Sequence, residues 1–245
     1  MLAIIGGSGL TQLANLEVAR REVVRTPYGD PSSALTFGRI GCRDVVFMAR
    51  HGHGHTIPPH LVNYQANIWA LAQSAGATGI VSVASVGGIR AGMGPGVIVV
   101  PNQIIDYTWG RKHTYQEGGN GQVVHVDFTE PYDSTLRASL LASAAKAGEP
   151  VIDGAVYATT QGPRLESAGE INRLERDGAD LVGMTGMPEA ALAREIGIPY
   201  AAICVVANWG AGRHDSLHAI HFEAIEAGLK KSLERVRVIL EHVCQ

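Results

Sequence analysis

Short apolar runs that alternate with helical patterns constrain the fold of this chain more than any other feature. Runs of consecutive apolar and β-branched residues are typical of strands buried on both faces of a parallel sheet. This alternation predicts an α/β fold: a single domain, residues 1–245, in which helices flank a mixed, mostly parallel, twisted sheet. The runs expected to form strands are Leu2–Ile5, Val45–Ala49, Ile80–Ser85, Val97–Val100, Val156–Thr159, Asp180–Met184 and Tyr200–Ala207.

Helices are expected where apolar residues recur at spacings of three or four. The clearest stripe is Leu61, Tyr64, Ile68 and Leu71. A polar, aromatic and glycine-rich stretch at Thr108–Asn120 predicts a long functional loop instead. The expected helices are His60–Ala75, Ser167–Arg176, Pro188–Ile196 and Leu217–Val243.

Composition excludes several classes of protein. A net charge of −3 argues against nucleic-acid binding, which needs a clustered basic face. The sequence contains no apolar run near the roughly 18 residues of a membrane span. Cys42, Cys204 and Cys244 are odd in number and irregular in spacing, so we interpret them as thiols in a reducing compartment. A cytoplasmic protein is therefore expected.

Small and cationic residues follow three of the expected strands. Gly6-Gly7-Ser8-Gly9 offers backbone N–H groups and a hydroxyl to an anion, and the arginine of Arg50-His51 suits phosphate oxygens. Ser85-Val86-Gly87-Gly88 is another turn of small residues. Ligands of open α/β sheets bind outside the carboxyl ends of the strands, so these segments predict an anion site there. Taken singly, each also fits a plain turn or a surface arginine.

A metal site is the alternative interpretation of the same region. In an extended segment His51, His53 and His55 would share one face, as in some zinc hydrolases. Such enzymes need further ligands from later strand ends, and His113, His125 and His214 lie in polar loops with no paired ligand nearby. The sequence therefore favours no metal, with a metal-dependent hydrolase as a remote alternative.

Five segments together resemble one enzyme family, the trimeric purine nucleoside phosphorylases and methylthioadenosine phosphorylases. The resemblance covers almost the whole chain in the right order. Within the family the chain is similar to the bacterial methylthioinosine phosphorylases through residues 159–166 and 184–190. The segments are Gly6-Gly7-Ser8-Gly9-Leu10, Arg50-His51-Gly52, Asn63-Tyr64-Gln65-Ala66-Asn67, Gln161-Gly162-Pro163-Arg164, and Met184-Thr185 with Met187-Pro188-Glu189.

The resemblance implies reversible phosphorolysis, in which a nucleoside and phosphate give a free purine and a sugar 1-phosphate. Inorganic phosphate is then a co-substrate, and neither a metal nor an organic cofactor is expected. A homotrimer is implied, with a hexamer as the alternative. In the family a neighbouring subunit closes the sugar pocket, and His113 or His125 would be the donor across that interface.

The resemblance also assigns roles to individual residues. Met184 would lie under the sugar, Leu165 would replace an aromatic residue that stacks on the base, and Glu166 and Asn208 would face the purine. The catalytic residues would be Asn208, Glu166 and His51. Phosphate would be held by Ser8, Arg50, His51, Ser85, Thr185 and the backbone of Ala84.

Departures from the family pattern bear on the substrate. Methylthioadenosine phosphorylases carry aspartates where Asn208 and Gly210 stand here, whereas Glu166 matches a carboxylate of 6-oxopurine enzymes. A carboxylate accepts from a 6-oxopurine N1–H and disfavours adenine, whose N1 is itself an acceptor. We therefore expect a 6-oxopurine nucleoside (methylthioinosine, inosine or guanosine), with methylthioadenosine as the alternative. His221 lies where hydroxyl-specific members carry a histidine for the ribose 5′-OH, which conflicts with the resemblance to methylthio enzymes.

A non-catalytic nucleoside-binding protein is the rival outside the enzymes. It would bind purine saturably and show no turnover when phosphate is added. A metal-dependent hydrolase would instead lose its activity to a chelator and need no phosphate.

Overall fold

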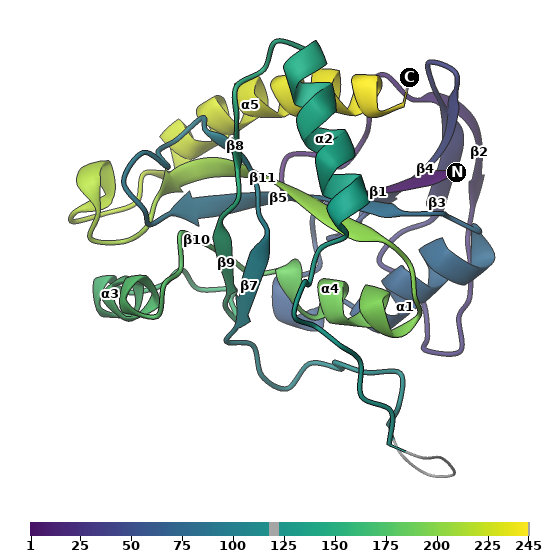
Figure 1. Ribbon diagram of the computed structural model, residues 1–245, viewed down its shortest axis with the longest axis horizontal. Coiled ribbons are helices and arrows are strands. Elements are labelled where there is room, and N and C mark those ends of the chain that lie inside the picture. The colour runs from purple at the N-terminus through teal and green to yellow at the C-terminus, as the bar shows by residue number, and fades with distance from the viewer. Residues whose placement is uncertain (118–122, 245) are drawn as a thin grey trace.

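The computed structural model describes residues 1–117 and 123–244, and it confirms the predicted α/β fold. Helices cover both faces of a mixed sheet, with α5 above it and α1 and α4 below it in Figure 1. The strands are β1 (Leu2–Gly6), β2 (Glu17–Glu22), β3 (Leu35–Ile40), β4 (Arg43–Ala49), β5 (Ile80–Gly88), β6 (Ile98–Val100), β7 (Gln103–Asp106), β8 (Val151–Asp153), β9 (Val156–Thr159), β10 (Leu181–Gly183) and β11 (Tyr200–Trp209).

Parallel pairing dominates the sheet around β5. β1 pairs in parallel with β4 and β5, and β11 runs parallel to β5 along most of its length. Antiparallel pairs occur at β2–β3, β3–β4, β5–β10 and β6–β11. β5 therefore has three neighbours, because β1 leaves it after Ser82 and β10 joins it at Gly87. The carboxyl ends of β1, β4, β5 and β11 meet at this fork.

The two faces of the sheet form two separate cores. Along β1, Leu2 and Ile4 pack into one core while Ala3 and Ile5 pack into the other, as the period of two in a strand requires. The first core holds α2 (Ser134–Lys146) and α5 (Phe222–Val243), and the second holds α1 (Tyr64–Trp69) and α4 (Gly186–Glu195). α3 (Ala168–Arg176) covers a smaller cluster beside β9 and β10.

The predicted helix at His60–Ala75 is interrupted. A 3₁₀ turn at Pro59–Leu61 comes first, α1 starts only after its N-cap Asn63, and a π-helical turn at Ala70–Ser74 follows. Tyr64, Ile68 and Leu71 are buried, but Leu61 is 66% exposed, so it lies off the stripe. α5 likewise starts at Phe222, five residues later than its apolar pattern predicts.

Elements that the pattern missed lack a strong apolar signal. β2 is fully exposed and rich in charge, and the α2 sequence mixes serine, alanine and arginine and buries only Leu140, Ser143 and Ala144. β7 and β8 have only four and three residues, none of them fully buried. β3 is buried at five of its six positions, but Gly38 and Arg39 interrupt its apolar run. These elements owe their structure to pairing and packing rather than to a local pattern.

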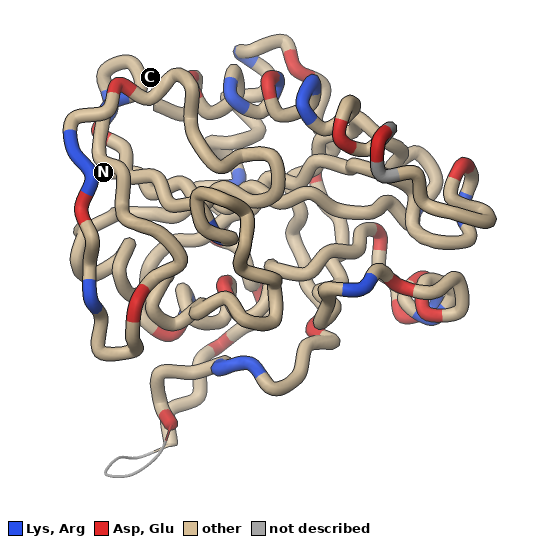
Figure 2. Tube along the Cα trace, turned by 180° about the vertical axis from the view of Figure 1, so that it is seen from behind, with Lys and Arg blue, Asp and Glu red and all other residues tan. Residues whose placement is uncertain are grey.

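The remaining features are the long segment between β7 and α2 and the charged surface of α5. From β7 to α2 the chain leaves the body as a long arm, visible below the molecule in Figure 1. Residues 118–120 of the predicted loop at Thr108–Asn120 lie outside the described residues. Basic and acidic side chains interleave along α5 (Figure 2). In the described part of the chain, no helix has the length and apolarity to cross a bilayer.

Candidate active site

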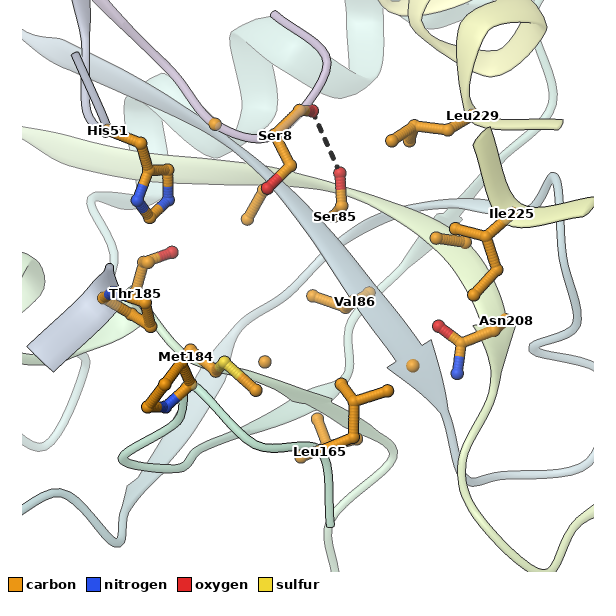
Figure 3. Close-up of a pocket in the computed structure, with 18 of the residues that line it drawn as sticks. Ser8, His51, Ser85, Val86, Leu165, Met184, Thr185, Asn208, Ile225 and Leu229 are labelled. Carbon is orange, nitrogen blue, oxygen red and sulfur yellow. Dashed lines mark hydrogen bonds between the residues drawn. The ribbon is translucent and has the colours of Figure 1, made fainter. Parts of the chain in front are cut away.

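A cavity of about 680 Å³ opens at the fork around β5. This volume lies in the range of ordinary ligand sites. Figure 3 shows its side chains, which come from strand ends, from the loop before α3 and from α5. The cavity brings together the sequence-predicted residues with one exception, His221; those that line it are Ser8, Arg50, His51, Ala84, Ser85, Leu165, Glu166, Met184, Thr185 and Asn208.

One end of the cavity, the hydroxyl end, consists of Ser8, His51, Ser85 and Thr185. Ser8, His51 and Thr185 each follow a different strand, and Ser85 lies within β5 near its fork, which is why residues so distant in sequence meet here. The Ser85 hydroxyl donates to the Ser8 carbonyl at 3.2 Å and so fixes the glycine-rich turn against β5. The hydroxyls of Ser8 and Thr185 are the side-chain donors that this end offers to an anion.

His51 is neutral near pH 7 and adds no positive charge beside Arg50. Burial, together with the neighbouring Arg50 charge, lowers its pKa to about 4. Nδ1 lies 2.8 Å from the Ile57 carbonyl, which can only accept, so Nδ1 carries the proton. Nε2 of the neutral ring is therefore an acceptor.

Arg50 lies deeper than its prediction at the mouth of the site. Its side chain is 1% exposed, and Nε and Nη2 donate to the Glu189 carboxylate at 2.5 and 3.0 Å. Nη2 also donates to Ser82 Oγ, and Nη1 donates to the Val83 carbonyl at 3.1 Å. One N–H of Nη1 remains, and a Cβ on Gly7 would come within 2.9 Å of that nitrogen. The glycine thus leaves room for the guanidinium behind the hydroxyl end.

Glu189 is a site residue whose role the sequence did not reveal. It is fully buried and accepts from Arg50, from Ser82 Oγ at 3.1 Å and from the Tyr200 hydroxyl at 2.8 Å. A buried carboxylate is tolerated only when it is paired and hydrogen-bonded. The signal was present in the sequence: Glu189 is a single charge within the apolar start of α4, residues 186–193.

The other end of the cavity has a polar wall made by Glu166 and Asn208. A bulge between Val206 and Asn208 interrupts the pairing of β11 with β5 and turns Asn208 toward the cavity, as Figure 3 shows. Asn208 Nδ2 donates to the Trp209 carbonyl at 2.6 Å, which fixes the amide plane. Glu166 Oε1 accepts from Thr160 Oγ1 at 2.5 Å. Leu165 and Val86 add apolar surface to the cavity near Asn208.

Beside this wall lies an apolar end made by Ile220, Ile225 and Leu229. Ile225 and Leu229 come from the first two turns of α5 and point inward in Figure 3. His221, predicted to face the sugar, is instead the exposed N-cap residue of α5 and does not line the cavity. The prediction placed it inside a helix that starts one residue later, so the side chain turns outward.

Arg111, which the sequence did not single out, ties the loops of this site together. It is 9% exposed, and Nη1 donates to the carbonyls of Met184 and Met187 at 2.8 and 2.7 Å. Nη2 donates to the carbonyls of Thr160 and Gln161 at 3.3 and 2.8 Å. Its position in the predicted functional loop was the available signal. Met184, whose side chain lines the cavity, is held through its backbone.

Of the three histidines that suggested a metal site, His51 and His55 both line the cavity, whereas His53 does not. The chain from His51 to His55 folds as consecutive turns, which leaves His51 buried and His53 and His55 exposed. The rings of His51 and His55 are tilted with centroids 4.7 Å apart. Among the described residues, no group of three or more His, Cys, Asp or Glu side chains is placed to hold a metal ion.

Comparison with known proteins places this architecture in a family. The profile of the phosphorylase superfamily matches residues 1–245. The chain belongs to the phosphorylase superfamily. It is 50% identical over 241 residues to a probable S-methyl-5′-thioinosine phosphorylase of Pseudomonas syringae, covering 98% of this chain and 97% of that protein.

Two further similar proteins are phosphorylases named for different purine nucleosides. A 6-oxopurine nucleoside phosphorylase of Pyrococcus furiosus is 43% identical over 244 residues, covering 98% of this chain and 90% of that one. The methylthioadenosine phosphorylase of Schistosoma mansoni, solved with adenine, superposes with a TM-score of 0.93 at 31% identity, over 99% of this chain and 90% of that one. The family predicted from the sequence motifs is thereby confirmed.

Proposed function

We propose that this protein cleaves a 6-oxopurine nucleoside by phosphorolysis, with S-methyl-5′-thioinosine as the preferred substrate. The observation that carries the proposal is the division of one cavity into a hydroxyl end, a wall with one carboxylate and one amide, and an apolar end. Phosphate, purine and the 5′ substituent of a nucleoside need these three surroundings. The names of the Pseudomonas and Pyrococcus relatives support the same reaction class.

Phosphate is proposed to bind at the hydroxyl end. Ser8, Ser85, Thr185 and the Ala84 backbone surround it, and the remaining Arg50 N–H approaches it from beneath Gly7. Because His51 Nε2 is an acceptor, it suits the P–O–H of monohydrogen phosphate, which leaves the ionised oxygens to the donors. Arg50 and Glu189 neutralise each other, so Arg50 contributes a rigid dipole and one donor rather than a free positive charge.

The reaction joins a phosphate oxygen to the anomeric carbon as the bond from that carbon to the purine N9 breaks. The electron pair of that bond passes to the purine, whose N7 takes up a proton. Monohydrogen phosphate loses one proton as it becomes the sugar phosphate ester, which balances the proton that the purine gains. Asn208 suits this leaving group because its oxygen accepts from N7–H while its second amide hydrogen donates to a 6-oxo group. Glu166 accepts from N1–H. The phosphorolysis needs no metal or organic cofactor, and their absence from the active enzyme stays a prediction.

The apolar end is proposed to hold the 5′ substituent. Ile220, Ile225 and Leu229 offer no hydrogen bond to a 5′-hydroxyl, and burying that hydroxyl against them would cost free energy. A methylthio group gains from the same contact. This end therefore supports a methylthio nucleoside over the 5′-hydroxyl substrate that His221 would favour.

The direct test is phosphate-dependent release of base from methylthioinosine, inosine and methylthioadenosine, measured side by side. We expect kcat/KM to be highest for methylthioinosine and release to stop without phosphate. A preference for methylthioadenosine would establish the alternative substrate, which the Schistosoma neighbour keeps open. Purine binding without turnover would establish a binding protein, and chelator-sensitive hydrolysis without phosphate a metal enzyme.

A cytoplasmic homotrimer remains our proposal for the working form. The arm after β7 carries exposed Trp109, Val123 and Val124 away from the body, as a subunit contact would require. His113 is engaged within its own chain, 3.1 Å from the Thr108 hydroxyl and 3.4 Å from Asp106. The exposed His125 is therefore the better candidate to reach a neighbouring sugar site.

A further inference from the structure

Both backbone polar groups of Thr160, its N–H and its carbonyl, are hydrogen-bonded. Its N–H donates to the Gly183 carbonyl of β10 at 2.8 Å, and its own carbonyl accepts from Arg111. The side chain therefore has a fixed origin. From there Oγ1 donates to Glu166 Oε1 at 2.5 Å, while Oγ1 also lies 3.3 Å from the Gly183 carbonyl.

This bond makes the two carboxylate oxygens of Glu166 unequal. Oε1 is held by a short hydrogen bond, and within the described residues no hydrogen bond reaches Oε2. Glu166 stands between the main cavity and a second cavity of about 390 Å³ that also borders Thr160. The carboxylate would be free to turn toward either side without the tether. With it, one oxygen is held in the wall and the other is left for a ligand.

The 6-oxopurines differ on the edge that such a carboxylate meets. Hypoxanthine presents one donor there, N1–H, and a C2–H beside it. Guanine presents N1–H together with a 2-amino group, and it pairs best with both oxygens of a carboxylate that is free to align with them. The Thr160 hydroxyl takes one lone pair of Oε1 and fixes the carboxylate plane, so Oε2 is the stronger acceptor for the single N1–H of hypoxanthine. Oε1 keeps one lone pair and cannot turn to align with the guanine 2-amino group, which makes it the poorer acceptor of the two.

We propose that Thr160 is a positioning residue that fixes the orientation of the Glu166 carboxylate, with Oε2 as its main acceptor, and so sets a preference for hypoxanthine over guanine nucleosides. The inference rests on the proposed function and refines its substrate class. Thr160 acts through Glu166, and its hydroxyl is the group that matters.

The test compares wild type with Thr160→Val, which keeps the shape of the side chain and removes the hydroxyl. In wild type we expect kcat/KM for inosine-type nucleosides to exceed that for guanosine-type nucleosides about tenfold or more, and in the variant the ratio should fall roughly tenfold. Most of the change should appear in KM, because the contact is made to the bound base. A ratio within twofold of wild type would overturn the proposal, and so would equal use of both bases by wild type.

Two matched variants isolate the hydroxyl. Thr160→Ser retains it and should keep the wild-type ratio. Thr159→Val alters the adjacent buried threonine, whose Oγ1 has no hydrogen-bond partner among the described residues, and should also leave the ratio unchanged. A shift in either variant as large as in Thr160→Val would remove the argument for a specific tether.

Calorimetric binding of free hypoxanthine and free guanine separates this inference from the proposed function. Absence of phosphorolysis in wild type would overturn the proposed reaction. The ratio of the two base affinities in wild type and in Thr160→Val still tests the tether in that case. An unchanged affinity ratio alongside normal phosphorolysis would refute the tether alone.

Discussion

The hydroxyl end and the nucleoside-facing parts of the cavity draw on different parts of the fold. The hydroxyl end rests on strand ends and on a buried set of charges, Arg50 and Glu189, whose side chains are 1% and 0% exposed. The polar wall and the apolar end come from the loop before α3, the bulged end of β11 and the first turns of α5, where most side chains are half-buried.

This difference separates the constant part of the reaction from the variable part. A phosphate group is the same in every phosphorolysis, so its donors can be fixed by a saturated network beneath the sheet ends, as preorganised electrostatic stabilisation requires. Purine and 5′ substituent vary among substrates. In the proposed binding mode they meet side chains that can change without disturbing a buried charge. We therefore predict large effects on stability at the hydroxyl end and large effects on selectivity at the other parts of the cavity.

The largest effect is expected from Glu189→Gln. The change leaves the Arg50 guanidinium buried without its counter-charge and should lower the free energy of unfolding by about 3–5 kcal/mol. Denaturant titration measures this loss. The control is Asp44→Asn in the exposed pair with Arg39, whose side chains are 68% and 57% exposed, where we expect a loss within about 1 kcal/mol. Equal losses in the two variants would contradict the contrast between buried and exposed pairs.

A smaller effect on stability should follow pH through His51. The folded-state pKa of about 4 lies below the ordinary value of 6.5, so the unfolded chain binds a proton first as the pH falls. Stability from this group is complete above pH 6.5 and is lost between pH 6.5 and 4, by about 3 kcal/mol.

The measurement is the unfolding free energy of wild type and His51→Asn across that range. The wild type should lose more stability than the variant as the pH falls, because asparagine does not titrate. Parallel pH profiles would show that His51 is not held neutral by its surroundings.

The smallest effect is expected at the apolar end. Ile225→Asn places an amide where the 5′ substituent is proposed to lie and should lower the kcat/KM preference for methylthioinosine over inosine about tenfold, without a comparable loss of stability. His221→Val is the matched control four residues away, because its exposed side chain should leave the ratio within twofold. A larger change at His221 than at Ile225 would reverse the assignment of this end.

Much of the fold could be predicted because its central strands are buried on both faces. β1, β4, β9 and β11 are continuous apolar runs for that reason, and their positions agree with the predictions within a few residues. β2 could not be predicted, because its exposed, charged residues are held by pairing with β3. The break at Ala70–Ser74 also leaves no local mark, since the same apolar stripe fits an α-helix and a π-helical turn.

The site shows a similar division. Motif residues such as Ser8 and Asn208 could be placed because they end or follow strands that converge. The interactions that set the chemistry of the site could not be predicted. Arg50 and Glu189 are 139 positions apart, so their pairing does not follow from the sequence. The neutral state of His51 depends on burial and on the neighbouring Arg50 charge, which only the fold reveals. His221 shows the limit of a motif, because α5 starts five residues later than its pattern predicts and His221 is its exposed N-cap residue.

The hydrogen bonds of Arg111 have a consequence for how the cavity comes into being. They join residues 47 to 76 positions apart along the chain, from Tyr64 on one side to Met187 on the other. Each such contact closes a long loop, and the entropy of that closure is recovered only when the contacts on all sides form together. The wall of the cavity therefore has no local precursor in the unfolded chain, and binding competence arises with the whole fold.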